Sequence, residues 1–195
     1  MKRMFDFVMA LTGIILLSPL WLIIALAILT DSQGGVLYIS KRIGRHERPF
    51  HFFKFRTMMP NRDDAGITVG NNDPRITRVG YYLRKYKLDE IPQLLNVLNG
   101  DMSIVGPRPD VPGYNSYYKK AFSDYYQFKP GITSYSSIYF SNESELYENS
   151  PDPEKQYIEE TIPKKVELDL PYFKNQHIGK DLQIIIKTLR KVVEN

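Results

Sequence analysis

The sequence predicts a mostly helical α+β protein: a single compact domain with an N-terminal re-entrant (helix-break-helix) membrane segment and a small β-hairpin. Residues 7–29 contain no charged side chain, residues 36–40 and 50–56 are short aromatic and β-branched runs, and much of the remainder has helical spacing. The 195 residues, 43% of them hydrophobic, suit one globular unit and exclude a disordered chain. We expect residues 1–31 in the membrane and residues 32–195 as a membrane-associated cytosolic domain.

The apolar run of residues 7–29 is long enough for a bilayer, which needs about 20 such residues. A secretory signal fits less well, because its apolar region has only roughly 7–15 residues. Ser18 and Pro19 lie at the midpoint of the run, and proline removes an amide donor and disfavours helical geometry at the residue before it. We therefore expect a break here, with the Ser18 hydroxyl satisfying a freed carbonyl.

Basic residues flank this segment on both sides. Lys2 and Arg3 precede it, and four cations follow it: Lys41, Arg42, Arg45 and Arg48. Because cytoplasmic flanks are rich in Lys and Arg, both flanks are expected on the cytosolic face of the membrane, which requires a re-entrant path. An ordinary kinked spanning helix is the alternative.

Positive charge is concentrated directly after the membrane segment. Residues 32–90 carry twelve Lys and Arg against six Asp and Glu, whereas residues 131–195 carry eight against eleven. Such a field attracts anionic headgroups or a phosphorylated substrate. Nucleic acid is not expected as a partner, because the sequence has no motif typical of nucleic-acid binding. The absence of Cys excludes disulfides and a thiolate nucleophile, and no P-loop, Rossmann or serine-hydrolase motif occurs.

The elements after the membrane segment follow from turn, capping and apolar-spacing signals. A hairpin over residues 36–56 comes first, and residues 106–109, with two prolines, form a rigid loop. Five helical segments are predicted: residues 73–87 beginning at Asp73, 89–99 ending at Gly100, 114–126, 153–169 with a break at Pro163, and 181–193. The apolar face of the last segment is expected to pack on the core, with the membrane surface as the alternative.

Asp89 and Glu90, two adjacent carboxylates at a predicted helix start, are the strongest candidates for chemistry. Capping is the alternative, since Asp is a favoured N-cap and Glu complements the helix dipole. Adjacent side chains can serve one centre only where a helix begins, and Mg²⁺ is usually held by one or two carboxylates together with phosphate oxygens. Four basic residues could neutralise a diphosphate: Lys54, Arg56, Arg84 and Arg108. The grouping indicates phosphoryl chemistry on a lipid.

A succession of short blocks runs from residue 2 to about residue 133. The blocks are Lys2 and Arg3 with Phe5 and Asp6, Ser18 and Pro19, and residues 54–58, 73–80, 83–84, 88–94, 96–97, 100–103 and 105–109. The succession resembles that of the bacterial sugar transferases, the small monotopic polyprenyl-phosphate phosphoglycosyltransferases. The tail fits more loosely, through Asp169, Tyr172, Asp181 and Leu182.

The resemblance implies a reaction at the cytosolic face of the bacterial inner membrane. A UDP-sugar would donate its phosphosugar to undecaprenyl phosphate and release UMP, the first membrane step of surface glycan or glycoconjugate assembly. Asp89 would attack the β-phosphorus and hold a covalent phosphosugar, and Glu90 would join Asp89 in binding Mg²⁺ and assist the lipid phosphate. An ionised aspartate can act without a base where cations offset its charge and that of the diphosphate.

The resemblance also implies a substrate pocket and makes the Ser18–Pro19 break the turn of the re-entrant helix. The expected substrate-binding residues are Lys54, Arg56, Arg75, Arg84, Pro107, Arg108 and Pro109. Residues 134–137 depart from the common family pattern, which leaves the sugar open. Two rivals remain: a noncatalytic membrane-anchored binding module in which Asp89 and Glu90 cap a helix, and a direct one-step transferase. The oligomeric state is also open, a dimer included.

Overall fold

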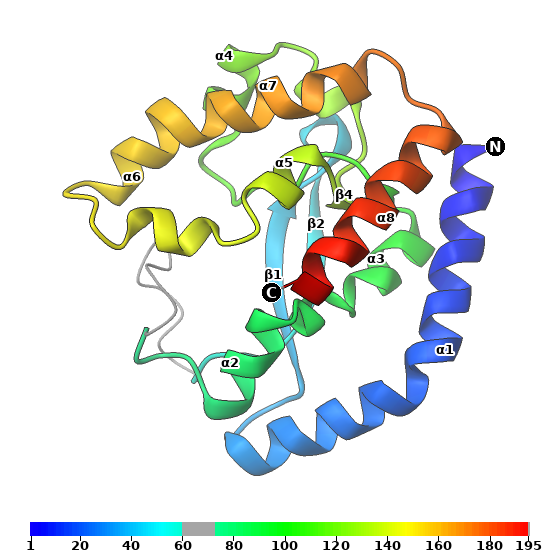
Figure 1. Ribbon diagram of the computed structural model, residues 1–195, viewed down its shortest axis with the longest axis vertical. Helices are drawn as coiled ribbons and strands as arrows, with labels where there is room; N and C mark the ends of the chain where they lie inside the picture. Colours follow the sequence, from blue (N-terminus) through cyan, green and yellow to red (C-terminus); the bar gives the residue numbers. More distant parts are fainter. Residues whose placement is uncertain (60–72, 195) are drawn as a thin grey trace.

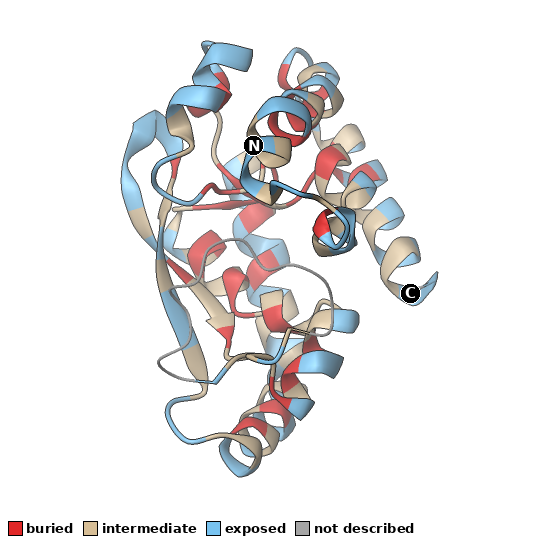
Figure 2. Ribbon diagram, turned by 90° about the vertical axis from the view of Figure 1, so that its left-hand side faces the viewer, coloured by how far each residue is buried: buried red, intermediate tan, exposed pale blue. Residues whose placement is uncertain are grey.

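Two antiparallel strands lie at the centre of the structure, a computed structural model that describes residues 1–59 and 73–194. Strand β1 (Leu37–Ile43) pairs with β2 (Pro49–Phe55), so that Leu37 lies opposite Phe55. Helices surround this hairpin, and buried residues are concentrated between it and the helices (Figures 1 and 2). The predicted hairpin and the mostly helical α+β fold are confirmed.

Helix α1 (Lys2–Asp31) is one helix that contains Pro19 and bends near the middle of its length (Figure 1). Because proline has no amide hydrogen, the carbonyl of Ile15, four residues earlier, loses its helical partner. The Ser18 hydroxyl donates a hydrogen bond to this carbonyl at 2.8 Å. The expected role of Ser18 is confirmed, and the expected break takes the form of a bend within one helix.

Most of the apolar surface of α1 is uncovered. By length and composition α1 could cross a membrane, and only 11% of its most apolar 18-residue window is buried. Its buried residues lie towards its two ends, Asp6 and Ala10 at one and Ile24 and Ile28 at the other. Asp6 accepts a hydrogen bond from the Ser103 hydroxyl at 2.9 Å, which attaches the helix to the rest of the domain. Whether α1 enters and leaves a bilayer on the same face stays a prediction.

Helix α2 (Arg78–Lys85) begins later than the sequence predicts. The Thr77 hydroxyl caps it by accepting a backbone amide hydrogen bond at 2.9 Å. Asp73, the expected start, instead accepts hydrogen bonds from the backbone and guanidinium of Arg75. The Thr77 amide donates to the Thr57 carbonyl at 3.0 Å, so the segment before the helix runs beside the end of the hairpin. This tertiary contact overrides the local start signal, and the predicted helix start at Asp73 is wrong.

A single 3₁₀ turn, η2 (Leu88–Glu90), connects α2 to α3 (Gln93–Asn99). The end of α3 at Gly100 is confirmed, because Gly100 has the left-handed φ of 91° typical of a helix C-cap. Its regular turns begin at Gln93 rather than at the expected Asp89. The Asn96 side chain accepts from the Phe53 amide and donates to a β2 carbonyl, so α3 and the turn before it are fixed against the hairpin.

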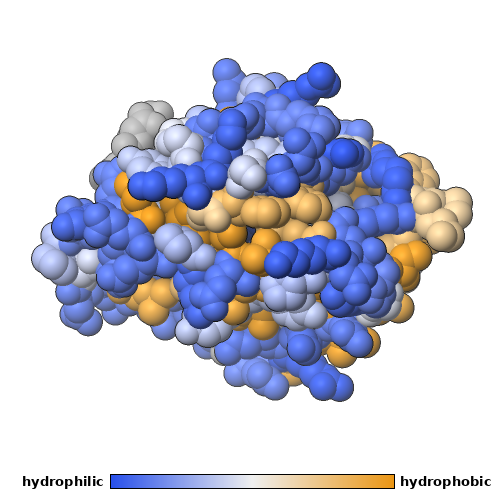
Figure 3. Space-filling view, turned by 90° about the horizontal axis from the view of Figure 1, so that it is seen from above, coloured by the Kyte–Doolittle hydropathy of each residue, from blue (hydrophilic) through white to orange (hydrophobic). Residues whose placement is uncertain are grey.

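The C-terminal half of the chain supplies the remaining walls of the domain. Its regular elements are β3 (Ser103–Val105), α4 (Asn115–Ala121), β4 (Gly131–Thr133), α5 (Tyr135–Tyr139), α6 (Pro153–Gln156), α7 (Ile162–Phe173) and α8 (Ile178–Glu194). Strands β3 and β4 pair in parallel, and their three-residue length leaves too little pattern for prediction. The face seen from above in Figure 3 is mostly hydrophilic, with apolar side chains gathered in a central strip.

Two of the predicted helices in this half differ in detail. Helix α4 ends at Ala121, short of the predicted residue 126, because Phe122 is extended and stacks on Phe173 with ring centroids 5.9 Å apart. The predicted break at Pro163 is wrong. A π-helical turn, η5 (Tyr157–Thr161), leads directly into α7, and Pro163 lies in the first turn of α7 without interrupting the helical path.

Helix α8 packs on the core through only part of its apolar surface. Ile184 is fully buried, and Ile185 contacts the same cluster. Four other apolar residues of this helix are exposed: Leu182, Ile186, Leu189 and Val193. The predicted packing of the whole apolar face on the core is therefore only partly correct, because the apolar residues occupy two sides of the helix.

Candidate active site

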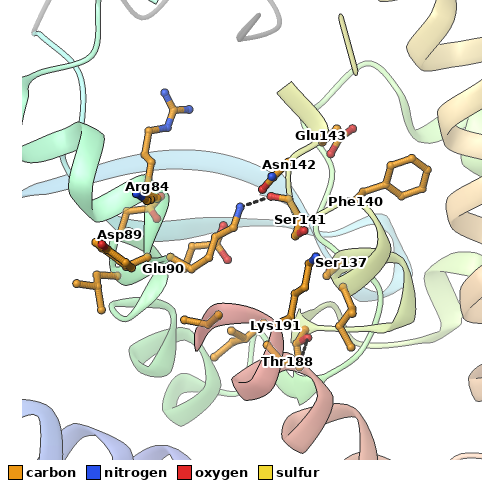
Figure 4. A pocket seen from close by; sticks show the side chains of 18 of the residues that line it. Arg84, Asp89, Glu90, Ser137, Phe140, Ser141, Asn142, Glu143, Thr188 and Lys191 are labelled. Carbon is orange, nitrogen blue, oxygen red and sulfur yellow. Dashed lines mark hydrogen bonds between the residues drawn. The ribbon is translucent and has the colours of Figure 1, made fainter. Parts of the chain in front are cut away.

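Asp89 and Glu90 lie in the tight η2 turn, at the junction of α2 and α3. Lys87, directly before the turn, has a left-handed backbone with φ 55°, and its carbonyl accepts from the Glu90 amide at 3.3 Å. Asp89 is only 5% exposed, and both carboxylates line one cavity (Figure 4). Neither η2 nor α3 has a side-chain cap, so Asp89 does not act as an N-cap in this part of the structure, although both acids lie in the first turn of η2, as the dipole part of the alternative requires.

Two cations, one on β2 and one in the loop after β3, form ion pairs with the carboxylates. The Lys54 ammonium, on β2, lies 3.2 Å from Asp89 Oδ2 and 2.8 Å from Glu90 Oε1, so it bridges the two residues. Arg108, in the loop after β3, donates from Nη2 to Glu90 Oε1 at 2.7 Å and from Nη1 to Oε2 at 3.4 Å. A bidentate guanidinium pair of this kind fixes the orientation of the carboxylate. The structure therefore joins four of the predicted site residues by ion pairs, and a fifth, Arg84, lines the same cavity.

These pairs set the protonation state of Glu90. Burial alone would raise the pKa of its carboxyl, but the charges of Arg108 and Lys54 and their hydrogen bonds outweigh this effect and hold the pKa well below its usual value. The Glu90 charge in turn raises the pKa of Arg108 above its ordinary value. Glu90 is thus an anion held between two cations and is not a proton donor in this state.

The cavity has a volume of about 650 Å³ and reaches from the two carboxylates to helices α1 and α8. Its polar end contains Arg84 and Lys87 as well, whereas Leu17 and Leu20 of α1 contribute apolar lining. Burial lowers the pKa of both Arg84 and Lys87, and this effect is opposed by the nearby Asp89 and Glu90 charges. A cavity of this size, with one charged and one apolar part, is suited to an amphipathic or two-part ligand.

Four of the predicted substrate-binding residues lie elsewhere. Arg56 donates to the Gln33 carbonyl at 2.8 Å, and Arg75 forms an ion pair of 2.6 Å with Asp73. Pro107 and Pro109 line a second, much smaller cavity, to which Arg108 also contributes. Among the residues that the structure describes, none of these four lines the larger cavity. Their proposed role in substrate binding stays a prediction.

The far wall of the cavity was not predicted, except for the divergent residues 134–137, whose departure from the family pattern indicated a pocket region. It comes from α5, the segment after it and the end of α8, and its polar side chains include Ser137, Asn142, Glu143, Thr188 and Lys191 (Figure 4). Glu143 accepts from the nearly buried Lys165 at 2.7 Å. No sequence motif marks these residues, because they come from separate segments that meet only in the folded chain.

The divergent residues 134–137 have a structural role. The Ser134 hydroxyl accepts from the Ser137 amide at 3.1 Å and caps α5. The Asp169 carboxylate accepts from the Ser136 amide at 2.9 Å and its hydroxyl at 2.6 Å. Burial raises the pKa of Asp169 to about 6, against the effect of these hydrogen bonds. The segment thus anchors α5, which forms one wall of the cavity.

Fold and site together define a class of protein: a mostly helical domain whose long apolar helix lines a cavity with two cation-bound carboxylates. The sequence model of the bacterial sugar transferase family matches residues 1–195. The chain therefore belongs to the bacterial sugar transferase family, and the resemblance seen in its motifs is confirmed.

Three similar proteins cover almost the whole chain. The UDP-glucose:undecaprenyl-phosphate glucose-1-phosphate transferase of Escherichia coli (strain K12) is 37% identical over 98% of this chain and 40% of its own length. The UDP-N-acetylgalactosamine-undecaprenyl-phosphate N-acetylgalactosaminephosphotransferase of Aeromonas hydrophila is 33% identical over 98% of this chain and 43% of its own length. Exopolysaccharide production protein ExoY of Rhizobium meliloti (strain 1021) is 34% identical over 98% of this chain and 84% of its own length. The chain thus spans about two fifths of the length of the first two relatives.

Proposed function

We propose that the protein transfers a phosphosugar from a UDP-sugar to undecaprenyl phosphate and releases UMP, as the first membrane step of surface glycan or glycoconjugate assembly. The observation that carries the proposal is the Asp89–Glu90 pair, held by Lys54 and Arg108 in a cavity that α1 also lines. The site offers a carboxylate nucleophile, cations for a diphosphate and an apolar wall for a lipid. The names of the E. coli and A. hydrophila relatives describe this reaction with different sugars.

In the first step, an Asp89 carboxylate oxygen attacks the β-phosphorus of the UDP-sugar. The bond from this phosphorus to the oxygen bridging the two phosphates breaks, and UMP leaves with that oxygen. The sugar phosphate is then bound covalently to Asp89 as an acyl phosphate. Lys54 and Arg108 contribute by offsetting the negative charge of the carboxylates and the substrate as the two approach.

In the second step, a phosphate oxygen of undecaprenyl phosphate attacks the same phosphorus. The bond to Asp89 breaks, which regenerates the free carboxylate and leaves a diphosphate-linked sugar on the lipid. Dividing the reaction in this way lets the soluble product leave before the lipid phosphate occupies the site. Glu90 assists by holding Lys54 and Arg108 in place, and these two cations attract the incoming lipid phosphate.

Mg²⁺ is the proposed cofactor. In residues 1–59 and 73–194, no group of three or more His, Asp or Glu could hold a metal, so a tightly caged ion is not expected. Asp89 and Glu90 nevertheless fit Mg²⁺, because this ion commonly takes one or two carboxylates and completes its coordination with substrate phosphate and water. When bound, it would neutralise charge on the diphosphate and on the leaving phosphate.

We expect the purified protein to release UMP from one UDP-sugar in a panel when undecaprenyl phosphate and Mg²⁺ are present. Donor supplied without lipid should give a single burst of about one UMP per active site, because the covalent step needs no acceptor. A luminescent UMP assay with active-site titration checks both amounts. Absence of UMP release from every UDP-sugar, from a folded protein in lipid nanodiscs, would contradict the proposed function.

The proposed location is the cytosolic face of the bacterial inner membrane, with α1 as a re-entrant helix. The chain has no cysteine, so Lys2→Cys and Lys41→Cys each create a single labelling site. We expect a membrane-impermeant maleimide to reach both positions from the cytosolic side only. Labelling of the two positions from opposite sides would show a spanning helix and contradict the re-entrant path.

A further inference from the structure

The cations around Asp89 and Glu90 fall into two groups. Lys54 and Arg108 already form ion pairs with the carboxylates. Arg84 lines the same cavity, as does Lys87, but neither forms an ion pair with a carboxylate of residues 1–59 or 73–194. The first group is therefore committed to the two carboxylates, whereas the second has charge available for a ligand.

Lys87 has a neutral partner although it lies among charged groups. Its ammonium donates to the Ser141 carbonyl at 2.5 Å, across the cavity from η2. An ammonium has three hydrogens to donate, and a half-buried cation such as Lys87 is stabilised better by an anion than by a carbonyl. Its left-handed backbone is uncommon for a residue with a side chain, and such conformations cluster at ligand sites. Lys87 is thus held in an unfavourable conformation with an incomplete set of partners.

Arg84 provides an independent observation. Its Nη1 atom is buried and has no hydrogen-bond partner within the described part of the chain. A buried guanidinium nitrogen without a partner costs free energy, so the described part of the protein does not fully satisfy Arg84. Figure 4 shows Arg84 beside Asp89 and Glu90, on the opposite side of the cavity from Ser141 and Asn142. Arg84 lies in the last turn of α2 and Lys87 directly before η2, and both line the cavity.

We propose that Lys87, together with Arg84, forms a phosphate-binding site that is distinct from the cations holding the two carboxylates. In this site the Lys87 ammonium exchanges the Ser141 carbonyl for a substrate phosphate oxygen, and Arg84 adds a second positive charge beside the same cavity. The ligand is a phosphate of the UDP-sugar or that of the lipid acceptor. The inference rests on the proposed function for these two substrates. Beyond that function, it assigns different roles to the two groups of cations: one holds the carboxylates and the other binds substrate.

The test compares ligands that differ only in phosphate. Binding of UDP and uridine, and of undecaprenyl phosphate and undecaprenol, is measured by calorimetry or fluorescence for the wild type, Lys87→Met and Lys87→Arg. Lys120→Met, which removes an exposed charge from α4, is the matched control. We expect Lys87→Met to weaken the binding of one phosphorylated ligand by about ten- to hundredfold and to leave the binding of its phosphate-free counterpart unchanged. Lys87→Arg should recover most of the loss.

The two arms identify the source of the phosphate. A selective loss of UDP binding assigns the site to the donor, and a selective loss of undecaprenyl phosphate binding assigns it to the acceptor. Equal weakening of both members of each pair would indicate a structural role and overturn the inference, as would affinities within about threefold of the wild type for all four ligands. These binding measurements need no turnover. A wild type that binds UDP but releases no UMP would therefore contradict the proposed function without contradicting the phosphate-binding site.

Discussion

Replacement of Asp89 by asparagine is expected to abolish lipid-linked product, with a loss of at least about 10³-fold in kcat. The amide is nearly the same size as the carboxylate but cannot attack phosphorus, so no covalent phosphosugar forms. The wild-type protein, incubated with its donor and Mg²⁺ but without lipid, should carry one sugar phosphate on the peptide that contains Asp89. Intact-protein and peptide mass spectrometry measure this adduct in both proteins.

The fold of the Asp89→Asn variant should survive, which makes its inactivity informative. Lys54 retains its 2.8 Å bond to Glu90, and α3 remains attached to the hairpin by Asn96. Asp124→Asn, an exposed change of the same chemistry, should keep full activity and serves as the control. Full turnover of the Asp89→Asn variant would support the noncatalytic role of Asp89. Turnover by the wild type without any adduct would instead favour direct transfer in one step.

The parts of the fold that the sequence predicts are those determined by neighbouring residues. The hairpin depends on two short aromatic and β-branched runs, and the end of α3 depends on Gly100. The bend in α1 depends on the Ser18–Pro19 pair, whose hydroxyl and missing amide act within a single turn. The start of α2 is different, because it depends on the contact between Thr77 and the Thr57 carbonyl. A contact between segments 20 residues apart leaves no local pattern, so the helix start predicted at Asp73 was wrong.

The same reasoning explains which site residues could be predicted. Asp89, Glu90 and Arg108 belong to short motifs that are visible in the sequence, and the structure brings them together with Lys54. Glu143 and Ser141 have no such motif, since they reach the cavity from a segment about 50 residues further along the chain. Charge alone did not predict which basic residues line the cavity. Arg56 and Arg84 are both arginines near the predicted site, yet of these two only Arg84 lines the cavity.

Replacement of Arg108 by methionine is expected to lower kcat/KM by about 10²–10³-fold. Arg108 makes a bidentate pair with Glu90 and is the cation that most strongly favours the charged form of that carboxyl. Without it, Glu90 keeps only Lys54, and the developing charge on the transferred phosphate loses a neighbouring guanidinium. Stability should fall by only about 1 kcal/mol, because the Arg108 side chain is 35% exposed and solvent screens the pair. Steady-state kinetics and thermal unfolding measure the two effects.

A double-mutant cycle with Glu90→Gln separates the contribution of this pair from general loss of positive charge. If Arg108 acts by orienting Glu90, the double variant should be little worse than either single variant, with a coupling of at least about 1 kcal/mol in transition-state free energy. Arg190→Met removes an exposed charge from α8 and should change neither activity nor stability. Arg108→Lys keeps the charge but not the bidentate geometry, so it should recover only part of the activity. Full additivity of the two changes would contradict the orienting role, because independent residues would then act separately on the substrate.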